Sequence, residues 1–581
     1  MRNNILFDFY AEKKTYFKFF SEFSPPNDLL MSSTSTNLIS LFENTIHNNW
    51  ELRSLSDYGG DSFSYKNVGE KILRIHRIFK ACGIKKGDKI ALLGKNSAHW
   101  GIFYLATVTY GAVIVPILPD FKPADIHFIV THSDSVILLV EDILFKDLDP
   151  GAMSSVKVIL NIPELSILHS GDPRFSADLT TAIREHEELM AKGITPDMIH
   201  FPQCSSDDIG VISYTSGTTG FSKGVVLQHK SLLGNILFAQ RNMPLNPKNK
   251  ILSFLPLAHT YGCAFEFLFP FTVGCDITFL TRTPSPKIIM QAFQEIRPDL
   301  ILSVPLVIEK IYKSQLIPVL RKPLIKILSH TPLLNQIIYK KIRAKMVAVF
   351  GGNFRELIIG GAPFNTQAER FFKKMKFPFT VGYGMTECGP LISYASWKTT
   401  RLGASGRIVD ELELRIDSTD PYRVAGEILV RGNHVMLGYY KNEEATHAVI
   451  DADGWLHSGD LGITDKLGNI YIKGRSKSMI LGPSGKNIYP EEIESILNNR
   501  FLVMESLIIE RGEKMIALIY PDADAMGKAG ITHEQLPELF KAYLHDLHHH
   551  FPKYIRIADF EIVSAEFEKT PKKSIKRFLY K

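Results

Sequence analysis

The chain has little cysteine, no long apolar run and no large charge excess. Its five cysteines stand far apart among 581 residues, with no C-x-x-C pair and no histidine at metal-ligand spacing. This pattern argues against a disulfide framework and a zinc finger, and it is typical of reduced thiols in a cytosolic protein. A formal net charge of +6 is too small to indicate nucleic acid as a partner.

The most hydrophobic stretch, residues 251–280, contains His259 and Glu266, so we interpret it as buried strands and a core helix, not as a membrane span. The first 30 residues lack the apolar core and the cleavage site of a signal peptide. We therefore expect an N-terminal extension over residues 1–36 and a folded domain that begins near Asn37.

Short apolar runs alternate with amphipathic segments from residue 38 to residue 140. Strands that alternate with helices indicate parallel βαβ units, and hence an α/β protein whose sheet is covered on both faces. Apolar residues make up 45% of the chain, which is enough for a large core, and the length predicts more than one domain. The segments expected to be helical are 38–50, 68–82, 98–110 and 123–131, and the expected strands are 61–65, 89–93, 112–117 and 136–140.

One stretch, residues 213–225, is rich in hydroxyl side chains and glycines and lies between two apolar runs. The backbone N–H groups of such a loop can form a nest for an anion, hydroxyls can donate to phosphate oxygens, and Lys223 adds a mobile positive charge. It is not a Walker loop, because a β-branched strand follows the lysine; a polar turn between strands is the alternative. The candidate phosphate-binding residues are Thr215, Ser216, Gly217, Thr218, Thr219, Gly220 and Lys223.

The pattern Tyr-Thr-Ser-Gly-Thr-Thr-Gly-x-x-Lys-Gly in this stretch resembles the ATP-phosphate loop of the adenylate-forming superfamily, which includes acyl-CoA synthetases, luciferases and peptide-synthetase adenylation domains. Ser222 stands where that family usually has proline. Further matches follow in the family's order, so the resemblance covers residues 37–581. It implies a large multi-sheet α/β domain over residues 37–476 and a small mobile C-terminal α/β domain over residues 477–581.

Three other segments resemble the family's nucleotide site. Gly361 and Ala362 follow an apolar run, at a position that the family uses against adenine. Asp460, in Gly-Trp-Leu-His-Ser-Gly-Asp, and Arg475, in Lys-Gly-Arg-Ser-Lys, are implied as ligands of the ribose hydroxyls. An ordinary turn aspartate is the alternative for Asp460.

The string Gly382-Tyr383-Gly384-Met385-Thr386-Glu387 matches the superfamily closely. Tyr383 can stack on adenine, Thr386 can bond the α-phosphate, and Glu387 can bind Mg²⁺ through oxygen. From the residues alone, a surface carboxylate is an equal interpretation of Glu387. The two glycines, Gly382 and Gly384, belong to the same implied site.

The segments Pro-Leu-Ala-His, which ends at His259, and Val-Pro-x-x-x-Glu-Lys, from Val304, resemble those of long-chain fatty acyl-CoA synthetases. His259 is thereby implied as a wall near the substrate carboxylate, although a loop histidine bonded to the backbone is equally consistent. Gly485 falls in the loop that the family places beside the pantetheine tunnel, and Lys477 falls at its interdomain hinge.

The C-terminal segment departs from the family, which has a lysine there that reaches the substrate carboxylate. Alignment of Thr570 and Arg577 without a gap puts Ser574 in that position. Serine cannot supply a cation, so Lys573 or Lys572 serves instead, or the enzyme works without such a lysine. We favour Lys573, because a lysine stem can reach round a one-residue shift.

Residues 310–345 contain no aspartate or glutamate, and their many lysines and arginines alternate with apolar residues. A basic amphipathic stretch can lie on an anionic membrane surface. The alternative is an ordinary amphipathic segment whose charged residues face water while its apolar residues pack against the protein core. We therefore consider a cytoplasmic protein with peripheral membrane contact.

The resemblance implies an acid–thiol ligase with ATP, Mg²⁺ and coenzyme A as cofactors and a fatty acid as substrate. An acyl carrier protein is an alternative acceptor. A phosphotransferase and a non-catalytic lipid-binding member of the fold are alternatives of other classes.

Overall fold

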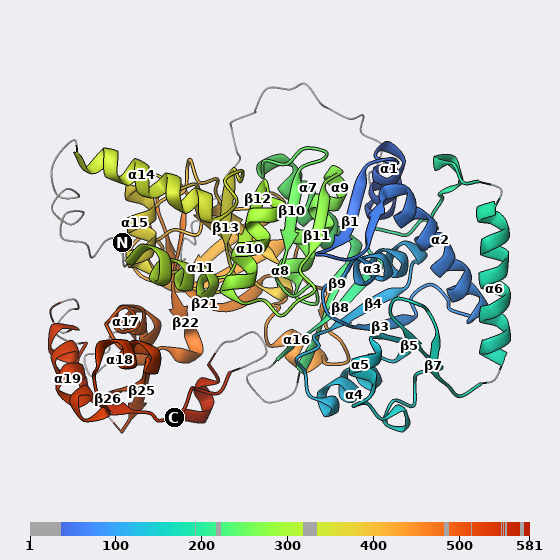
Figure 1. The fold of residues 1–581 in the computed structure, drawn as a ribbon. Helices are drawn as coiled ribbons and strands as arrows, with labels where there is room; N and C mark the ends of the chain where they lie inside the picture. Colours follow the sequence, from blue (N-terminus) through green and yellow to red (C-terminus); the bar gives the residue numbers. More distant parts are fainter. Residues whose placement is uncertain are drawn as a thin grey trace, which may run out of the picture. The chain divides into compact units, whose positions relative to one another are not determined.

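The computed structural model describes residues 37–172, 174–191, 193–216, 222–317, 334–481, 487–512, 514–547, 549, 551, 555–569 and 575–580. Within these residues, helices lie against several separate β-sheets (Figure 1). This arrangement confirms the predicted α/β class. The helices outside the sites discussed below are α1 (Leu38–Asn48), α2 (Tyr65–Ala81), α4 (Pro123–His132), α5 (Asp142–Phe145), α6 (Arg174–Ala191), α10 (Pro286–Ile296), α11 (Pro305–Ile311), α15 (Thr366–Lys374) and α16 (Glu443–His447).

The largest sheet has a parallel centre and antiparallel margins. Its strands, in spatial order, are β20 (Gly438–Tyr439), β9 (Ser222–Gln228), β8 (Ile209–Ser216), β4 (Val113–Ile117), β3 (Lys89–Leu93), β5 (Ser135–Val140), β6 (Val158–Asn161) and β7 (Ile167–Ser170). From β8 to β6 neighbouring strands run parallel, whereas β9, β20 and β7 pair antiparallel with their neighbours. The parallel strands are continuous apolar runs because they are buried on both faces.

Helix α3 (Ala98–Tyr110) lies against this sheet and is buried along nearly its whole surface. The Ser97 side chain accepts a hydrogen bond from the backbone N–H of Trp100 and starts the helix, and Gly111, at φ 82°, ends it. The helix contacts β3 and β4 on one side and β1 (Arg53–Asp57) of a second sheet on the other. An apolar surface all round is what such a central position requires.

Two smaller sheets carry further parallel strands. One is β10 (Lys250–Ser253), β11 (Asp276–Phe279), β1 and β2 (Ser62–Ser64), and the other is β12 (Leu300–Ser303), β13 (Glu356–Ile359) and β14 (Phe379–Val381). Between β10 and β11 the chain forms α8 (Thr260–Gly262), the π-helical turn η3 (Cys263–Leu268) and α9 (Phe269–Val273). This stretch is almost wholly buried, which confirms the interpretation of residues 251–280 as core.

Antiparallel strands follow. They are β15 (Tyr383–Gly384), β16 (Leu391–Tyr394) and β17 (Arg407–Ile408) in one sheet, and β18 (Leu412–Asp417), β19 (Gly426–Gly432), β21 (Leu456–Thr464) and β22 (Ile470–Arg475) in another. After residue 478 the described elements are β23 (Ile480–Leu481), β24 (Asn487–Ile488), α17 (Pro490–Leu497), β25 (Val503–Arg511), β26 (Lys514–Pro521), α18 (Ala523–Ala529), α19 (Leu536–Leu547) and β27 (Ile557–Ile562).

Buried apolar side chains form separate clusters on the two sides of residue 478. One cluster runs from Leu38 to Ile470, and another runs from Ile480 to Ile557. No described helix is both long and apolar enough to cross a membrane. All five cysteines are free thiols, as their spacing predicts.

Most predicted elements match within a few residues. The strand at 89–93 and the helix at 98–110 have the expected limits. Helix α2 begins three residues earlier than predicted, at Tyr65, because Ser64 and Asn67 form a capping box. The prediction of a loop over residues 213–225 is partly wrong: strand pairing continues from β8 to Ser216 and resumes in β9 at Ser222.

Candidate active site

The hydroxyl-rich stretch forms a hairpin between β8 and β9. Thr215 pairs with Lys223, and Ser216 pairs with Ser222, so both phosphate candidates Thr215 and Lys223 lie at the end of the ladder. The amino-acid composition of this stretch predicts a loop, but hydrogen bonds between the two strands pair its backbone groups and extend the strands into it. Gly217, Thr218, Thr219 and Gly220 lie outside the described residues.

Lys223 and Glu387 contact the same aromatic side chain, Tyr439. The Lys223 Nζ lies 4.8 Å from the centroid of the Tyr439 ring, and the Tyr439 hydroxyl donates to Glu387 Oε1 at 2.9 Å. Burial, and then the neighbouring Glu387 charge, raise the pKa of Tyr439, so its hydroxyl keeps its proton and donates. Sequence reasoning missed this residue; its one signal is the Gly-Tyr-Tyr string at residues 438–440.

A second polar group joins β15, β21 and β22. Asp460 and Arg475 stand directly opposite each other in the β21–β22 ladder, and Arg475 Nε lies 3.1 Å from Asp460 Oδ1. The hydroxyl of Tyr383 donates to Asp460 Oδ2 at 2.7 Å. Burial raises the pKa of Asp460, which is 6% exposed, and the charge of Arg475 opposes this effect. This group presents a carboxylate and a guanidinium side by side, which suits a pair of hydroxyls.

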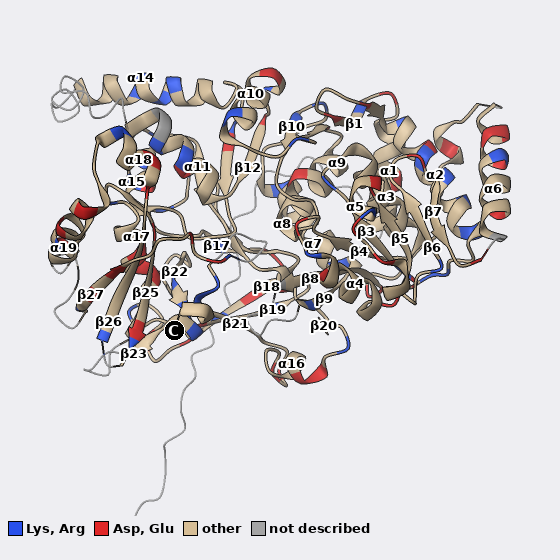
Figure 2. Ribbon diagram, turned by 60° about the horizontal axis from the view of Figure 1, so that its bottom comes forward, with Lys and Arg blue, Asp and Glu red and all other residues tan. Residues whose placement is uncertain are grey.

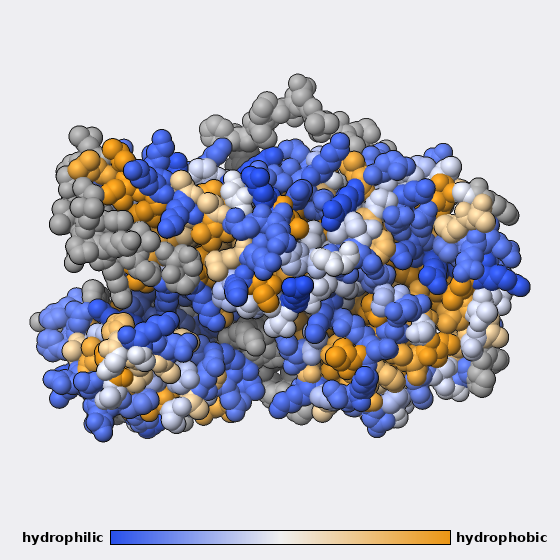
Figure 3. All heavy atoms as spheres, in the orientation of Figure 1, coloured by the Kyte–Doolittle hydropathy of each residue, from blue (hydrophilic) through white to orange (hydrophobic). Residues whose placement is uncertain are grey.

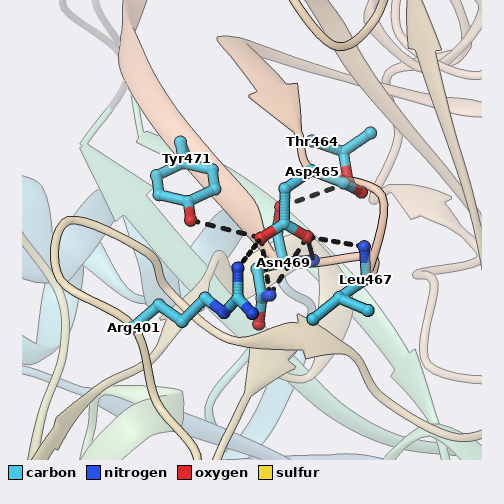
Figure 4. A network of polar contacts seen from close by, with 6 residues as sticks. All are labelled: Arg401, Thr464, Asp465, Leu467, Asn469 and Tyr471. Carbon is cyan, nitrogen blue, oxygen red and sulfur yellow. Dashed lines mark hydrogen bonds and ion pairs between the residues drawn. The ribbon is translucent and has the colours of Figure 1, made fainter.

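The register that pairs Asp460 with Arg475 depends on the turn between β21 and β22. The carboxylate of Asp465 accepts hydrogen bonds from the backbone N–H groups of Leu467 and Asn469 and from the Tyr471 hydroxyl (Figure 4). Arg401, from outside the hairpin, donates to the same carboxylate at 3.2 Å. One partly exposed carboxylate therefore fixes the turn and, through it, the cross-strand pair.

The glycine candidates lie at the carboxyl ends of neighbouring parallel strands. Gly361 follows β13 and Gly382 follows β14, and the backbone N–H of Gly382 donates to the carbonyl of Ile359. Gly361 has φ +86°, and a Cβ on Gly384 would lie 2.2 Å from the carbonyl oxygen of Pro390, so glycine is required at both positions. Ligands of open α/β sheets typically bind at these carboxyl ends. Ala362 is exposed beside Gly361.

His259 is the N-cap residue of helix α8, and its carbonyl accepts a hydrogen bond from the N–H of Cys263. Two residues on, Tyr261 packs against Gly360 and donates its hydroxyl to the carbonyl of Ile358 at 3.1 Å. The Pro-Leu-Ala-His segment is thus held beside the carboxyl end of β13, close to Gly361.

An apolar pocket lies between this segment and the β8–β9 hairpin. Helix α7 (His229–Asn242), which follows β9, closes part of it. Its lining includes Ser213, Leu227, Leu232, Ala258, Cys263 and Leu268. The pocket therefore lies between the β8–β9 hairpin and the turn that carries His259.

The buried carboxyl of Glu266 in η3 fixes the segment that leads to His259. Its Oε2 accepts from the Ser253 hydroxyl at 3.1 Å and from the backbone N–H groups of Phe254 and Leu255 at 3.0 and 2.9 Å. Burial raises its pKa well above the ordinary value. One oxygen of this buried carboxyl therefore serves three donors.

The remaining candidates are placed differently. Thr386 is buried in the short turn η5 (Thr386–Cys388), between the two polar groups. Lys477 is exposed in the turn η6 (Ser476–Ser478), directly after β22. Gly485 and Lys573, together with Lys572 and Ser574, lie outside the described residues.

Magnesium fits the donor set at Glu387. Proteins usually bind Mg²⁺ of a nucleotide through one or two carboxylates together with substrate phosphates. Among the described residues there is no group of three or more His, Cys, Asp or Glu side chains that could hold a metal ion. A cation at Glu387 would therefore take its remaining ligands from a phosphate chain and from water.

The combination of an anion-compatible hairpin, a carboxylate–guanidinium pair and strand-end glycines is typical of nucleotide-binding proteins. The chain belongs to the family of AMP-binding enzymes, whose model matches residues 42–440.

Relatives with assigned functions are similar over most of the chain. It is 28% identical to the long-chain-fatty-acid–CoA ligase FadD15 of Mycobacterium bovis, over 76% of this chain and 74% of that one. It is 26% identical to long chain acyl-CoA synthetase 5 of Arabidopsis thaliana, over 76% of this chain and 70% of that one.

Solved structures show the same fold. ATP-bound MatB from Rhodopseudomonas palustris matches with a TM-score of 0.72 at 23% identity, over 94% of this chain and 98% of that one. A fatty acyl CoA synthetase of Mycobacterium tuberculosis matches with a TM-score of 0.63 at 20% identity, over 94% and 97%. These matches confirm the adenylate-forming fold that the motifs predict.

Proposed function

We propose that this protein is an ATP-dependent acid–thiol ligase that converts a fatty acid to an acyl-adenylate and then to acyl-CoA. The observation that carries the proposal is the proximity of the two polar groups. Tyr383, which bonds Asp460, and Glu387, which bonds Tyr439, belong to one segment of five residues. The names of the two curated relatives support a long-chain fatty acid as the substrate class.

In the first step a fatty carboxylate oxygen attacks the α-phosphorus of ATP, and the bond to pyrophosphate breaks. Thr215 and Lys223, with the tip of the hairpin, bind the β- and γ-phosphates, and Thr386 bonds the α-phosphate. Asp460 and Arg475 hold the ribose hydroxyls. Bound Mg²⁺ supplies charge neutralisation on the phosphates, and Glu387 would hold it. Catalysis here is positioning and electrostatic stabilisation, as in other transfers at phosphorus.

In the second step the thiolate of coenzyme A attacks the acyl carbonyl and AMP leaves. Gly485, beside the pantetheine path, serves this step, whereas the cation of Lys573 serves the first. An acyl carrier protein is the competing acceptor. Thioester formed with free coenzyme A, and none formed with a carrier protein, supports the proposal.

The acyl chain is assigned to the apolar region near His259, between Ser213 of the β8–β9 hairpin and the side chains of η3. The cavity there is about 10 Å³, room for one water molecule, so its lining side chains have to move before a chain can enter with its carboxylate toward the phosphates. Fatty-acid-dependent AMP release across a panel of chain lengths tests this assignment.

We also propose a domain boundary and hinge at Lys477. The apolar clusters end at Ile470 and begin again at Ile480, which supports separate domains over residues 37–476 and 477–581. The two half-reactions need different groups at one acyl carbon, and a rotation at Lys477 would supply them in turn. Lys477→Pro fixes φ there and should slow thioester formation more than adenylate formation. Equal slowing of both half-reactions argues against the hinge.

Peripheral membrane contact through helix α14 (Leu334–Val349) is proposed as well. Lys340, Lys341 and Lys345 are exposed on it, and Leu334 and Ile337 are 43% and 54% exposed near its start. Basic residues follow the helix in Figure 2, and Figure 3 shows apolar surface over the same helix at the upper left. A basic, partly apolar surface of this kind suits an anionic lipid headgroup layer.

One experiment separates this function from its two alternatives. Fatty-acid-dependent exchange of pyrophosphate into ATP supports adenylation. Transfer of the γ-phosphate to an acceptor would instead indicate a phosphotransferase. Binding of fatty acid with neither reaction would indicate a non-catalytic lipid-binding protein.

A further inference from the structure

Tyr439 separates two opposite charges of the candidate active site. Its ring faces the Lys223 ammonium at 4.8 Å, and its hydroxyl donates to Glu387 Oε1 at 2.9 Å. No ion pair links Lys223 to Glu387 in the part of the chain that the structure describes. We propose that Tyr439 is a positioning residue that keeps these two charges apart in the nucleotide-free protein, so that both stay available to a polyphosphate and its divalent cation. The inference rests on the proposed function.

The backbone of Tyr439 is held on both sides, so its ring has a defined place. In the β20–β9 ladder Tyr439 is opposite Val225, which puts its side chain diagonal to that of Lys223. The following N–H, of Tyr440, donates to the carbonyl of Gly224 at 2.7 Å, and the N–H of Tyr439 donates to the Thr446 hydroxyl at 2.9 Å.

A backbone hydrogen bond holds the turn that carries Glu387 next to the segment that carries Tyr439. The N–H of Met436 donates to the carbonyl of Glu387 at 2.8 Å, so the turn that carries the carboxylate is fastened to the segment that leads into β20. The side chains of Lys223 and Glu387 thus approach one ring from two different elements.

The chemistry of a phenol suits a spacer between these charges. The face of the ring attracts an ammonium group without neutralising it, and the hydroxyl gives the carboxylate one neutral donor. A lysine side chain is long and flexible, so in the absence of the ring Lys223 could swing onto Glu387 and form an ion pair. Polyphosphate binding would then have to break that pair first, which lowers affinity.

A double-mutant cycle without any nucleotide tests the spacer directly. Lys223→Met, Glu387→Gln and the double variant are each made in the native background and in a Tyr439→Leu background. The midpoint of urea unfolding is measured for every variant. We expect the two changes to be additive with Tyr439 present. We expect them to be clearly non-additive with leucine, because an ion pair has formed. Equal coupling in both backgrounds overturns the proposal.

Three further variants serve as controls for this test. Tyr439→Phe retains the ring and should show additive behaviour, like the native protein. If Tyr439→Leu does not fold, Tyr439→Met, with an unbranched side chain, replaces it in the cycle. Tyr440→Leu is the matched control, since the Tyr440 hydroxyl bonds Asp134 and not the site.

Titration with Mg²⁺ and a non-hydrolysable ATP analogue gives the functional consequence. Tyr439→Leu should weaken binding about tenfold, Tyr439→Phe about threefold, and Tyr440→Leu less than twofold. Unchanged binding in Tyr439→Leu contradicts the positioning role. If the native protein itself does not bind the analogue, the proposed function fails, while the unfolding cycle still decides whether Tyr439 separates the charges.

Discussion

Replacement of Glu266 by leucine should destabilise the protein far more than replacement by glutamine. The carboxyl is fully buried, and one of its oxygens accepts hydrogen bonds from Ser253, Phe254 and Leu255. Leucine would leave two buried backbone N–H groups without an acceptor. Each such loss costs about 1–3 kcal/mol, so the expected destabilisation is about 2–6 kcal/mol. The amide oxygen of glutamine can serve the same donors, and its cost should stay near 1 kcal/mol.

The difference in stability between the native protein and Glu266→Gln should depend on pH, because the pKa of Glu266 is raised in the folded protein. The folded protein keeps the proton well above the ordinary value of 4.5, whereas the unfolded chain releases it near that value. The stability that this proton contributes is complete below about pH 4.5 and is lost as the pH rises toward the folded pKa. Native protein should therefore lose up to about 1.4 kcal/mol per pH unit relative to Glu266→Gln.

The assay is denaturant unfolding of the three proteins at pH 5, 6, 7 and 8, with the midpoint of the unfolding transition as readout. The stability of Glu266→Gln relative to the native protein should rise with pH until the folded pKa of Glu266 is reached, and Glu266→Leu should be the least stable at pH 5. Parallel curves for native and glutamine proteins, or a leucine variant as stable as the glutamine variant, would refute the reasoning.

Three further predictions concern the candidate site and the surface. Asp460→Asn should raise the KM for ATP about ten- to hundredfold, because a charged acceptor is worth about 1.5–3 kcal/mol, with little change in unfolding midpoint; an unchanged KM removes Asp460 from the site. Lys573→Ala should reduce adenylate formation and spare attack of coenzyme A on preformed adenylate, and Ser574→Lys should accelerate the first step; full rates in Lys573→Ala would disprove that assignment. Lys340→Gln with Lys341→Gln should weaken binding to anionic vesicles by about 1 kcal/mol per charge and leave neutral vesicles unaffected; equal loss on both vesicle types would point to unfolding instead.

Locally determined features were predictable from the sequence. Helix α3 has its expected limits because both of its ends are set by neighbouring residues, Ser97 and Gly111. The cross-strand pair of Asp460 and Arg475 could not be predicted from neighbouring residues. The register of its two strands depends on Asp465 and on a donor, Arg401, from another segment. The resemblance assigned both residues to ribose without indicating that they contact each other.

The role of Tyr439 was unpredictable for a related physical reason. Its place beside Lys223 results from pairing between β9 and β20, which are far apart in the chain, and no periodicity marks a strand of two residues. The buried acid Glu266 is similar: it lies in an apolar stretch that predicts core, and only the structure shows which donors its carboxyl serves.

The position of β20 at the margin of the largest sheet has a consequence for synthesis of the protein. The 209 residues between Gln228 and Gly438 must be translated before β9 receives its outer partner. At about 5–20 residues per second this takes roughly 10–40 s. Throughout that interval a nascent chain carries an unprotected strand edge with Val225 and Val226, which invites pairing with other nascent chains. Ribosome-bound intermediates of this length should therefore depend strongly on chaperones, and fragments that stop short of residue 438 should aggregate.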